Sequence, residues 1–367
     1  MDFQHVIAWG AFLAVVLVML AVDLFVLHRK PHAIQMKEAL LGAAVPVGVA
    51  LLFTAAIFYA YQNKIFHLGV IPPNVADTPA AKFFPDTGSE AVLMYLTGYL
   101  VELSLSADNV FLFVILMAFF KVPRELQHRV LFWGVLGALV MRGIMIGAAA
   151  YLTRFEIVIY LFGLFLVYAG VKMLFSGEPK DPSDNLAVKL VRKLFPFKDG
   201  FDGKKFFTVE NGKRVATTLF LVLVCIEFTD LVFALDSIPA IFGITRDSFI
   251  VFTSNVFAIL GLRSLYFLLA GVMDKFHLLK YGLAVVLGFV GVKMVLPGAA
   301  EVLGHFTHRE YHWEVDKMLS LGVIVLALAG SVVASLLFPS KAHHRNPLED
   351  EAATATPAPR PPTMPAS

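Results

Sequence analysis

The chain has 367 residues, of which 58% are hydrophobic and 16% are charged, and its mean hydropathy is +0.75. Soluble domains are about 45–50% apolar and about 25% charged, so this composition excludes an ordinary soluble protein and indicates a polytopic membrane protein. With a formal net charge of only +2, we expect the lipid bilayer, and no nucleic acid, as its surroundings and partner. The single cysteine, Cys225, cannot form an intrachain disulfide.

Stretches of about 20 predominantly apolar residues predict single membrane crossings. The first stretch follows no Lys or Arg and is longer than the apolar core of a signal peptide, so we interpret it as a retained span. Nine crossings are predicted in chain order, at residues 5–27, 37–62, 89–120, 128–151, 155–176, 215–242, 249–273, 276–297 and 317–339. The third and sixth are too long for one straight crossing, so we expect each to tilt or break. The predicted fold is an all-α polytopic membrane protein.

These crossings divide the chain into six parts. They are two N-terminal helices in residues 1–63, a three-helix unit in 89–176, a cytoplasmic linker loop in 177–214, a second three-helix unit in 215–297, the last helix in 317–339 and a tail in 340–367. The tail ends in a Pro-rich and Ala-rich sequence that cannot bury a core, and we expect it to be disordered and cytoplasmic.

Lys and Arg residues are distributed unevenly between the two sides of the predicted bundle. With the amino terminus outside, 19 of the 30 Lys and Arg residues fall on the cytoplasmic side and six on the other. Membrane proteins keep an excess of basic residues in their cytoplasmic loops. The distribution therefore predicts an amino terminus outside the cell and a carboxyl terminus in the cytoplasm.

Residues 155–173 recur at residues 276–294, a shift of 121 positions, and both copies end in Gly-Val-Lys-Met. The same shift carries Arg142 onto Arg263, and a shift of 122 carries Asp108 onto Asp230. The repeating unit is therefore three helices long. Because three is odd, the second unit must enter the membrane from the opposite side, which is an inverted-topology arrangement common in secondary transporters.

Five carboxylates lie in predicted crossings where the bilayer would hold them at mid-depth. Each costs ~2.5–3.5 kcal/mol on insertion scales, so it needs a partner or a task. They are Glu102 and Asp108 in one motif, and Glu227, Asp230 and Asp236 in the other. A local overlay of the motifs pairs Glu102 with Asp230 and Asp108 with Asp236, whereas the repeat shift pairs Asp108 with Asp230. Both overlays remain open.

The candidate ligands around these acids are all oxygens. They include the side chains of Asn109 and Ser237, and a backbone carbonyl that Pro239 would free by opening a helical turn. Oxygen ligands suit hard cations such as Mn²⁺, Mg²⁺ and Ca²⁺. Residues six apart on one helix differ by ~9 Å of rise, so the ligands of one ion must come from both units. We therefore interpret the five acids, Asn109 and Ser237 as metal ligands, with Glu227 or Glu102 as a candidate proton acceptor.

The alternative is internal neutralisation, in which Arg142 and Arg263 pair with carboxylates and lock the bundle. Five acids against two arginines would still leave a surplus. The sequence contains no phosphate loop, nucleophile elbow or haem motif, so it favours neither an enzyme nor an ATP-driven pump. We expect no bound cofactor.

At these residues the chain resembles the TerC family of integral membrane proteins, and more closely its Alx-like branch. The matching stretches include residues 102–113 and 227–240, the Asp236-Ser-Ile-Pro-Ala run and the Ser254-Asn255 pair. The resemblance implies export of Mn²⁺ across the bacterial inner membrane. It also implies that the family's intramembrane acids fall on Glu102, Asp108, Asp230 and Asp236, with Asn109 and Asn255 as polar neighbours. The family's name comes from tellurite-resistance clusters.

Two classes of function follow from these features. The first is a secondary transporter that exports divalent cations, Mn²⁺ above all, through a midplane carboxylate site, with exchange for protons as an option and Ca²⁺/H⁺ exchange as an alternative. The second is a membrane scaffold in a tellurite-resistance or stress-response complex, in which arginines neutralise the acids. The sequence identifies no protein partner.

Overall fold

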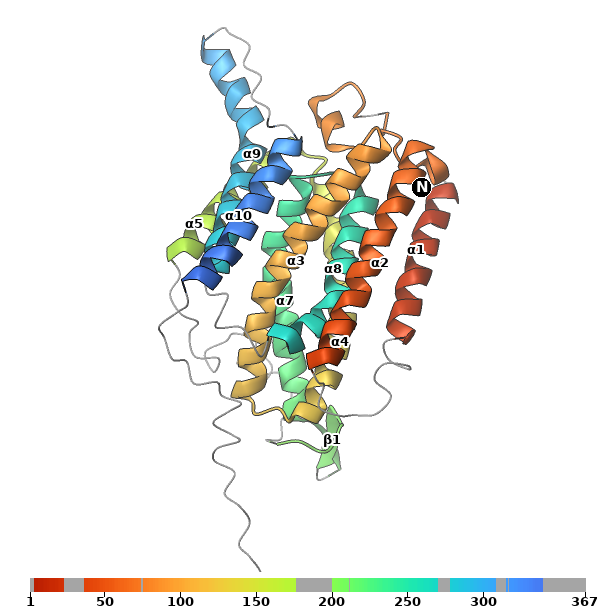
Figure 1. Ribbon diagram of the computed structural model, residues 1–367, viewed down its shortest axis with the longest axis vertical. Helices are drawn as coiled ribbons and strands as arrows, with labels where there is room; N and C mark the ends of the chain where they lie inside the picture. The colour runs from red at the N-terminus through yellow and green to blue at the C-terminus, as the bar shows by residue number, and fades with distance from the viewer. Residues whose placement is uncertain are drawn as a thin grey trace, which may run out of the picture.

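The structure is a computed structural model. The structure describes residues 3–22, 36–73, 75–175, 200–210, 212–269, 278–307, 315 and 317–338. Within these residues the fold is a bundle of long helices lying side by side, with a small β-hairpin at one end (Figure 1).

Nine long α-helices occur in the described residues, and all nine predicted crossings fall on them. Their bounds are α1 Phe3–Val22, α2 Met36–Gln62, α3 Gly88–Phe119, α4 Arg124–Leu152, α5 Glu156–Phe175, α7 Thr218–Phe242, α8 Ser248–Leu269, α9 Leu279–Thr307 and α10 Lys317–Leu337. Seven of them are long and apolar enough to cross a membrane, and α8 contributes a shorter apolar stretch over residues 248–262. The chain is therefore an all-helical polytopic membrane protein.

The long helices α3 and α7 run without interruption. Pro239 lies inside α7, and the helix continues past it to Phe242. Of the expected tilt or break of these helices, the break is therefore wrong, and so is the opened turn at Pro239. A proline lacks only its own N–H donor, so a helix can pass through it when neighbouring groups and packing hold the other hydrogen bonds.

The segments between helices contain small elements that the hydropathy pattern did not reveal. Two short 3₁₀ helices, η2 Ile65–His67 and η3 Pro79–Phe83, lie between α2 and α3. Strands β1 Phe207–Glu210 and β2 Lys213–Ala216 pair antiparallel at the end of the predicted linker. Each strand has four residues, too short for a hydropathy window to detect.

The helices of the two predicted units pack mainly against each other. The most extensive helix contact joins α5 to α9, α3 packs on α8, and α4 packs on α7. Within the described residues, helices that follow one another in a unit, such as α3 and α4, make no comparably extensive contact. Neither unit therefore forms a bundle by itself, because each buries its helices against the other.

Helices α3 and α7 run in opposite directions. The backbone N–H of Arg246, just after α7, donates to the carbonyl of Phe83, just before α3, at 2.9 Å. The hydroxyl of Thr245 donates to the same carbonyl at 3.0 Å. The last turn of α7 thus lies beside the first turn of α3, as the ribbon also shows (Figure 1).

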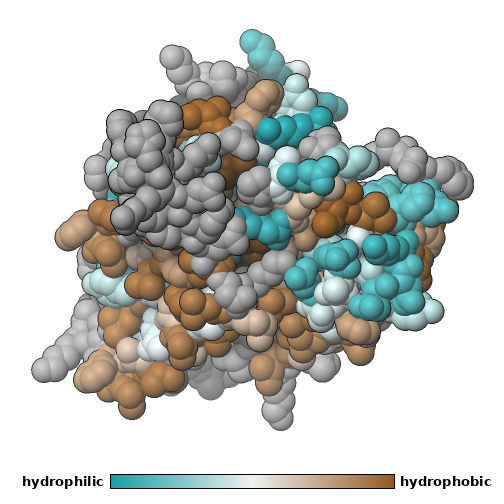
Figure 2. All heavy atoms as spheres, turned by 90° about the horizontal axis from the view of Figure 1, so that it is seen from above, coloured by the Kyte–Doolittle hydropathy of each residue, from teal (hydrophilic) through white to brown (hydrophobic). Residues whose placement is uncertain are grey.

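The end of the molecule that carries residues 63–87 differs from the sides of the bundle. Seen from above, hydrophilic side chains gather over one side of this end, and hydrophobic side chains predominate over another part of it (Figure 2). Large apolar side chains also point outward along the helices, among them Leu17, Leu52, Ile144, Ile157 and Leu326. An apolar belt with polar ends is the surface that a bilayer requires.

Candidate functional site

A single arginine holds two of the predicted acids in the centre of the bundle. Arg142 of α4 is 1% exposed. Its Nε and Nη2 atoms donate to the two carboxylate oxygens of Asp230 on α7, at 3.2 and 2.8 Å. Its Nη1 atom forms an ion pair with Oε1 of Glu102 on α3. One guanidinium therefore joins a carboxylate from each helical unit.

An amide completes this network. Nη1 of Arg142 also donates to Oδ1 of Asn255 on α8, at 2.9 Å, and Nδ2 of Asn255 donates to Oε2 of Glu102, at 3.2 Å. The hydroxyl of Ser106 donates to Oε1 of Glu102, at 3.2 Å. We call Glu102, Arg142, Asp230 and Asn255 the central network. Its four residues come from four helices, and four of the five guanidinium donors have acceptors.

The central network lies deep along the helices and far from water. Glu102, Asp230 and Asn255 are buried like Arg142, and each residue stands near the middle of its helix. With both carboxylates ionised, the network carries a net charge of −1. This excess negative charge, held by four helices, is a feature that a cation could neutralise.

Glu227 lies beside the network without joining it. It is three residues before Asp230 on α7, so both face the same side of the helix. Its carboxylate packs directly over Gly137 of α4, where a Cβ atom would collide with it. No described residue donates a hydrogen bond to Glu227. Gly137 gives no signal in the sequence beyond the absence of a side chain at this position of the crossing.

Asp236 and Ser237 form a separate location. They lie about two turns beyond Asp230 on α7, a rise of ~9 Å along the axis. Asp236 is half-buried and interacts electrostatically with Lys172 of α5. Ser237 is buried, and its hydroxyl has no hydrogen-bond partner among the described residues. The structure therefore places Asp236 and Ser237 apart from the central network.

Two predicted site residues cannot be placed as side chains. The side chains of Asp108 on α3 and Arg263 on α8 lie outside the described residues. Asn109, next to Asp108, is buried. Among the described residues, no group of three or more His, Cys, Asp or Glu side chains is arranged to hold a metal ion.

Two contacts made by glycines bear on the two overlays of the acidic motifs. Gly98 of α3 faces Ser254 of α8, and Gly134 of α4 faces Ile226 of α7. The overlay that pairs Glu102 with Asp230 is a shift of 128 positions, and it carries Gly98 onto Ile226. The shift of 121 carries the residue next to Gly134 onto Ser254, so the two contacts become nearly equivalent. The shift of 122, which pairs Asp108 with Asp230, would carry Gly98 onto a position six residues before Ile226. If the predicted repeat holds, these two contacts agree with the overlay that pairs Glu102 with Asp230.

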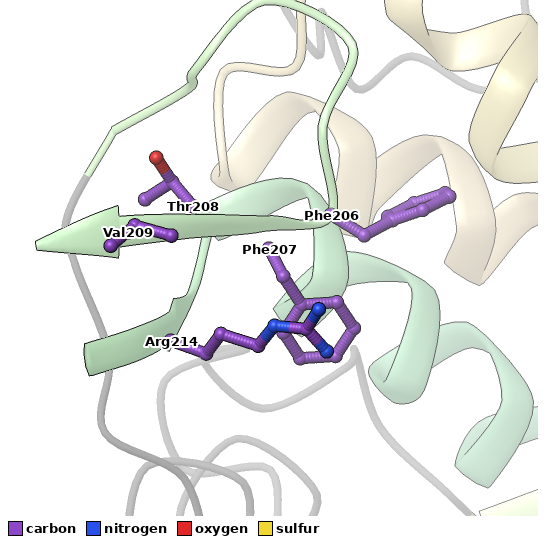
Figure 3. Close-up of a pocket in the computed structure, with 5 residues that line it drawn as sticks. All are labelled: Phe206, Phe207, Thr208, Val209 and Arg214. Atoms are coloured by element: carbon purple, nitrogen blue, oxygen red, sulfur yellow. The ribbon is translucent and has the colours of Figure 1, made fainter. Parts of the chain in front are cut away.

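A surface pocket lies on the hairpin, away from these acids. It is lined by Phe206, Phe207, Thr208, Val209 and Arg214, and the side chains of Phe207 and Arg214 overlap in the view of Figure 3. None of its lining residues is acidic. The buried network, not this pocket, is the candidate cation site.

Comparison with known proteins identifies the family. The model of the integral membrane protein TerC family matches residues 87–343. The chain belongs to the TerC family. The matched segment includes α3, α4, α7 and α8, so every residue of the central network lies in the TerC region.

Other TerC-like proteins align over most of the chain. An "Uncharacterized membrane protein STKORF319" of Myxococcus xanthus is 44% identical over 90% of this chain and 92% of its own length. A protein of Escherichia coli K12 named "Putative membrane-bound redox modulator Alx" is 46% identical over 78% of this chain and 85% of its own length. A membrane protein of Rickettsia bellii is 33% identical over 90% of this chain. No solved structure matches.

Proposed function

We propose that this TerC protein is a secondary transporter that exports a hard divalent cation, with Mn²⁺ as the substrate, from the cytoplasm. The observation that carries the proposal is the meeting of Glu102 and Asp230 in one buried network. These carboxylates come from different helical units and face each other around a single positive charge. Substrate sites of secondary transporters commonly lie near the midplane at the interface between two repeated units.

The contacts between helices support an inverted repeat of two three-helix units. The repeat pairs α3 with α7, α4 with α8, and α5 with α9. Under this pairing the contact of α3 with α8 becomes that of α7 with α4, and both occur. The contact of α5 with α7 likewise becomes that of α9 with α3, and both occur. Nine crossings with this symmetry, in a bacterial inner membrane and with the amino terminus outside, complete the proposed architecture.

The remaining acids supply the chemistry of coupling. Glu227 and Asp236 have no guanidinium partner among the described residues, so we assign them the uptake of a proton or a role as further ligands of the ion. Carboxylate, amide and hydroxyl oxygens favour Mn²⁺ and Ca²⁺ over soft metals. Ca²⁺ in exchange for protons is therefore the alternative substrate pairing.

A cellular metal inventory tests this function. Bacteria that express Glu102→Gln, Asp230→Asn or Asp236→Asn would be loaded with Mn²⁺, and their retained metal would be compared with that of wild-type cells. We expect cells with Asp236→Asn to retain more Mn²⁺ at normal protein abundance, and cells with Glu102→Gln or Asp230→Asn to retain more Mn²⁺ after correction for the abundance of each variant. Asp86→Asn, an exposed carboxylate outside the helices, is the matched control and should export normally. Normal export by all three variants would contradict the proposal.

One observation favours a second function, that of a membrane scaffold. The two ion pairs of Arg142 can lock the four helices together, and the described residues hold no preformed metal cluster. A scaffold requires the network for folding but not Asp236. It therefore predicts that Glu102→Gln and Asp230→Asn lower protein abundance, while Asp236→Asn changes neither abundance nor retained Mn²⁺.

Uptake of Mn²⁺ and of Ca²⁺ by separate vesicles that contain the protein distinguishes the two candidate substrates of the transporter.

A further inference from the structure

The guanidinium of Arg142 occupies the space between the two carboxylates that a transported ion would bridge. It bonds both oxygens of Asp230 and one oxygen of Glu102. In a buried site, two carboxylates that converge on the same point repel each other unless a cation lies between them. In the structure that cation is Arg142.

A divalent ion bound between these two carboxylates would occupy the position of the guanidinium and be repelled by its positive charge. The bidentate bond from Nε and Nη2 leaves neither oxygen of Asp230 free of the arginine. On Glu102, Oε1 faces Arg142 and Ser106, and Oε2 faces Asn255. An ion that takes Glu102 and Asp230 as ligands must therefore displace Arg142.

We propose that Arg142 is a built-in counter-cation, which holds Glu102 and Asp230 together when no ion is bound and competes with the transported ion for them. This inference rests on the proposed function and deepens it. The competition weakens the affinity of the site, and the return of the guanidinium helps to expel the ion. It also keeps an empty site from exposing two unpaired carboxylates in the bilayer. Arg142 is thus a positioning residue that acts through the two acids.

Glu227 provides a place for the displaced guanidinium. Its carboxylate, which comes from α7, packs against α4 at Gly137. Gly137 lies five residues before Arg142 on α4. Glu227 accepts no hydrogen bond from a described residue, and it stands on the face of α7 that also carries Asp230. In this arrangement the guanidinium moves from Asp230 to Glu227 when an ion binds, so its charge stays paired.

Binding of Mn²⁺ to purified full-length protein in detergent tests the inference. Arg142→Gln removes the competing charge, and we expect it to bind Mn²⁺ at least tenfold more tightly than wild type. Arg142→Lys keeps the charge but cannot bond both oxygens of Asp230 together with Asn255. Its affinity should lie between the two. Arg142→Gln combined with Asp230→Asn should lose the gain, because it removes a ligand as well as the competitor.

The order of affinities decides the inference. The inference would be overturned if Arg142→Gln and Arg142→Lys both bind Mn²⁺ no more tightly than wild type while a thermal unfolding assay shows that they are folded. If Arg142→Gln does not fold, Arg142→Lys carries the test, since it retains the charge. The proposed function fails separately: it fails when Glu102→Gln and Asp230→Asn cells export Mn²⁺ normally, whatever the purified protein binds.

Discussion

At the scale of single residues, Arg142 shows how a charge is held inside an apolar bundle. Its donors find acceptors on three other helices, at Glu102, Asp230 and Asn255. Removing one partner of a buried ion pair costs ~3–5 kcal/mol, because the other charge is then left unpaired. The acids of the central network therefore affect stability as well as function, and a test of function needs residues outside the ion pairs.

Gly137 is such a residue. A Cβ atom there would collide with the carboxylate of Glu227, and a flexible side-chain end can move aside. We expect Gly137→Ala to displace Glu227, lower Mn²⁺ export severalfold and leave protein abundance near that of wild type. Gly134→Ala, one turn earlier on α4, places its Cβ at an ordinary 3.4 Å from Ile226 and is the control. Retained metal in cells is the measurement, and equal export by both variants would contradict a role for Glu227.

Asp247 makes stability depend on pH. It precedes α8, and its Oδ1 accepts from the N–H groups of Phe249 and Ile250 at 2.9 and 3.2 Å. Burial raises the pKa of Asp247, although these N–H groups and the nearby His5 partly offset the effect. The pKa of Asp247 in the folded protein lies above the unfolded value of ~3.9, so the fold favours the protonated carboxyl. The stabilisation from this preference is complete below the unfolded value. It is lost as the pH rises through the folded pKa.

We therefore expect Asp247→Asn to flatten the pH dependence of the unfolding temperature above pH ~4, since Asn also caps helices well and never ionises. Thermal unfolding in detergent across this range measures it. Asp86→Asn changes an exposed carboxylate at the same end and should leave the profile unaltered. A profile of Asp247→Asn as steep as that of wild type would refute the assignment.

At the scale of elements, the α5–α9 contact repeats itself within one interface. A Cβ atom on Gly170 would lie 2.7 Å from the carbonyl oxygen of Ala284, and one on Gly291 would lie 2.6 Å from that of Gly163. The shift of 121 positions converts the first contact into the second with helices exchanged. Small residues thus bring the two backbones together, as in other membrane helix pairs.

Gly291→Ala should separate these helices. The added methyl group meets backbone, which cannot rotate away, so we expect a loss of ~1–3 kcal/mol in the free energy of unfolding. Gly288→Ala, on the same helix with open space at its Cβ position, is the matched control. It should be neutral or slightly stabilising, because Ala favours a helix over Gly by about 1 kcal/mol. Thermal unfolding in detergent gives both values, and equal stability of the two variants would contradict close packing at Gly291.

At the scale of the whole molecule, the opposed directions of α3 and α7 set which loops share a side of the membrane. The end of α7 and the start of α3 meet at Thr245, Arg246 and Phe83. The hairpin lies at the opposite end of the bundle (Figure 1). Under the proposed orientation, Phe83 is outside and the hairpin is in the cytoplasm.

Single cysteines test this orientation. Cys225 is the chain's only cysteine, so Cys225→Ala gives a cysteine-free background. We expect Asp86→Cys and Arg154→Cys to react with an impermeant thiol reagent on intact cells. Val209→Cys, at an exposed position of the hairpin, should react only after the cells are opened. Labelling of Val209→Cys on intact cells, without labelling of the other two, would reverse the proposed orientation.

The sequence by itself determined the helices and the acids within them. Runs of apolar residues placed nine helices to within a few residues at most ends, because the bilayer requires about 20 such residues per crossing. Within the described residues, the largest difference is the extension of α9 to Thr307. The sequence also revealed the acidic motifs, because a carboxylate within an apolar run is rare and easily recognised. Its resemblance to the TerC family is confirmed.

Only the tertiary structure decided how these acids are used. It brought Glu102 and Asp230 to the same guanidinium, placed Asp236 near Lys172 instead, and packed Glu227 on Gly137. None of these pairings can be read from spacing along one helix, because each joins residues of different helices whose crossing depends on side-chain shape. Hydropathy indicates which residues lie within the bilayer, whereas the packing of the helices decides which side chains a buried acid contacts.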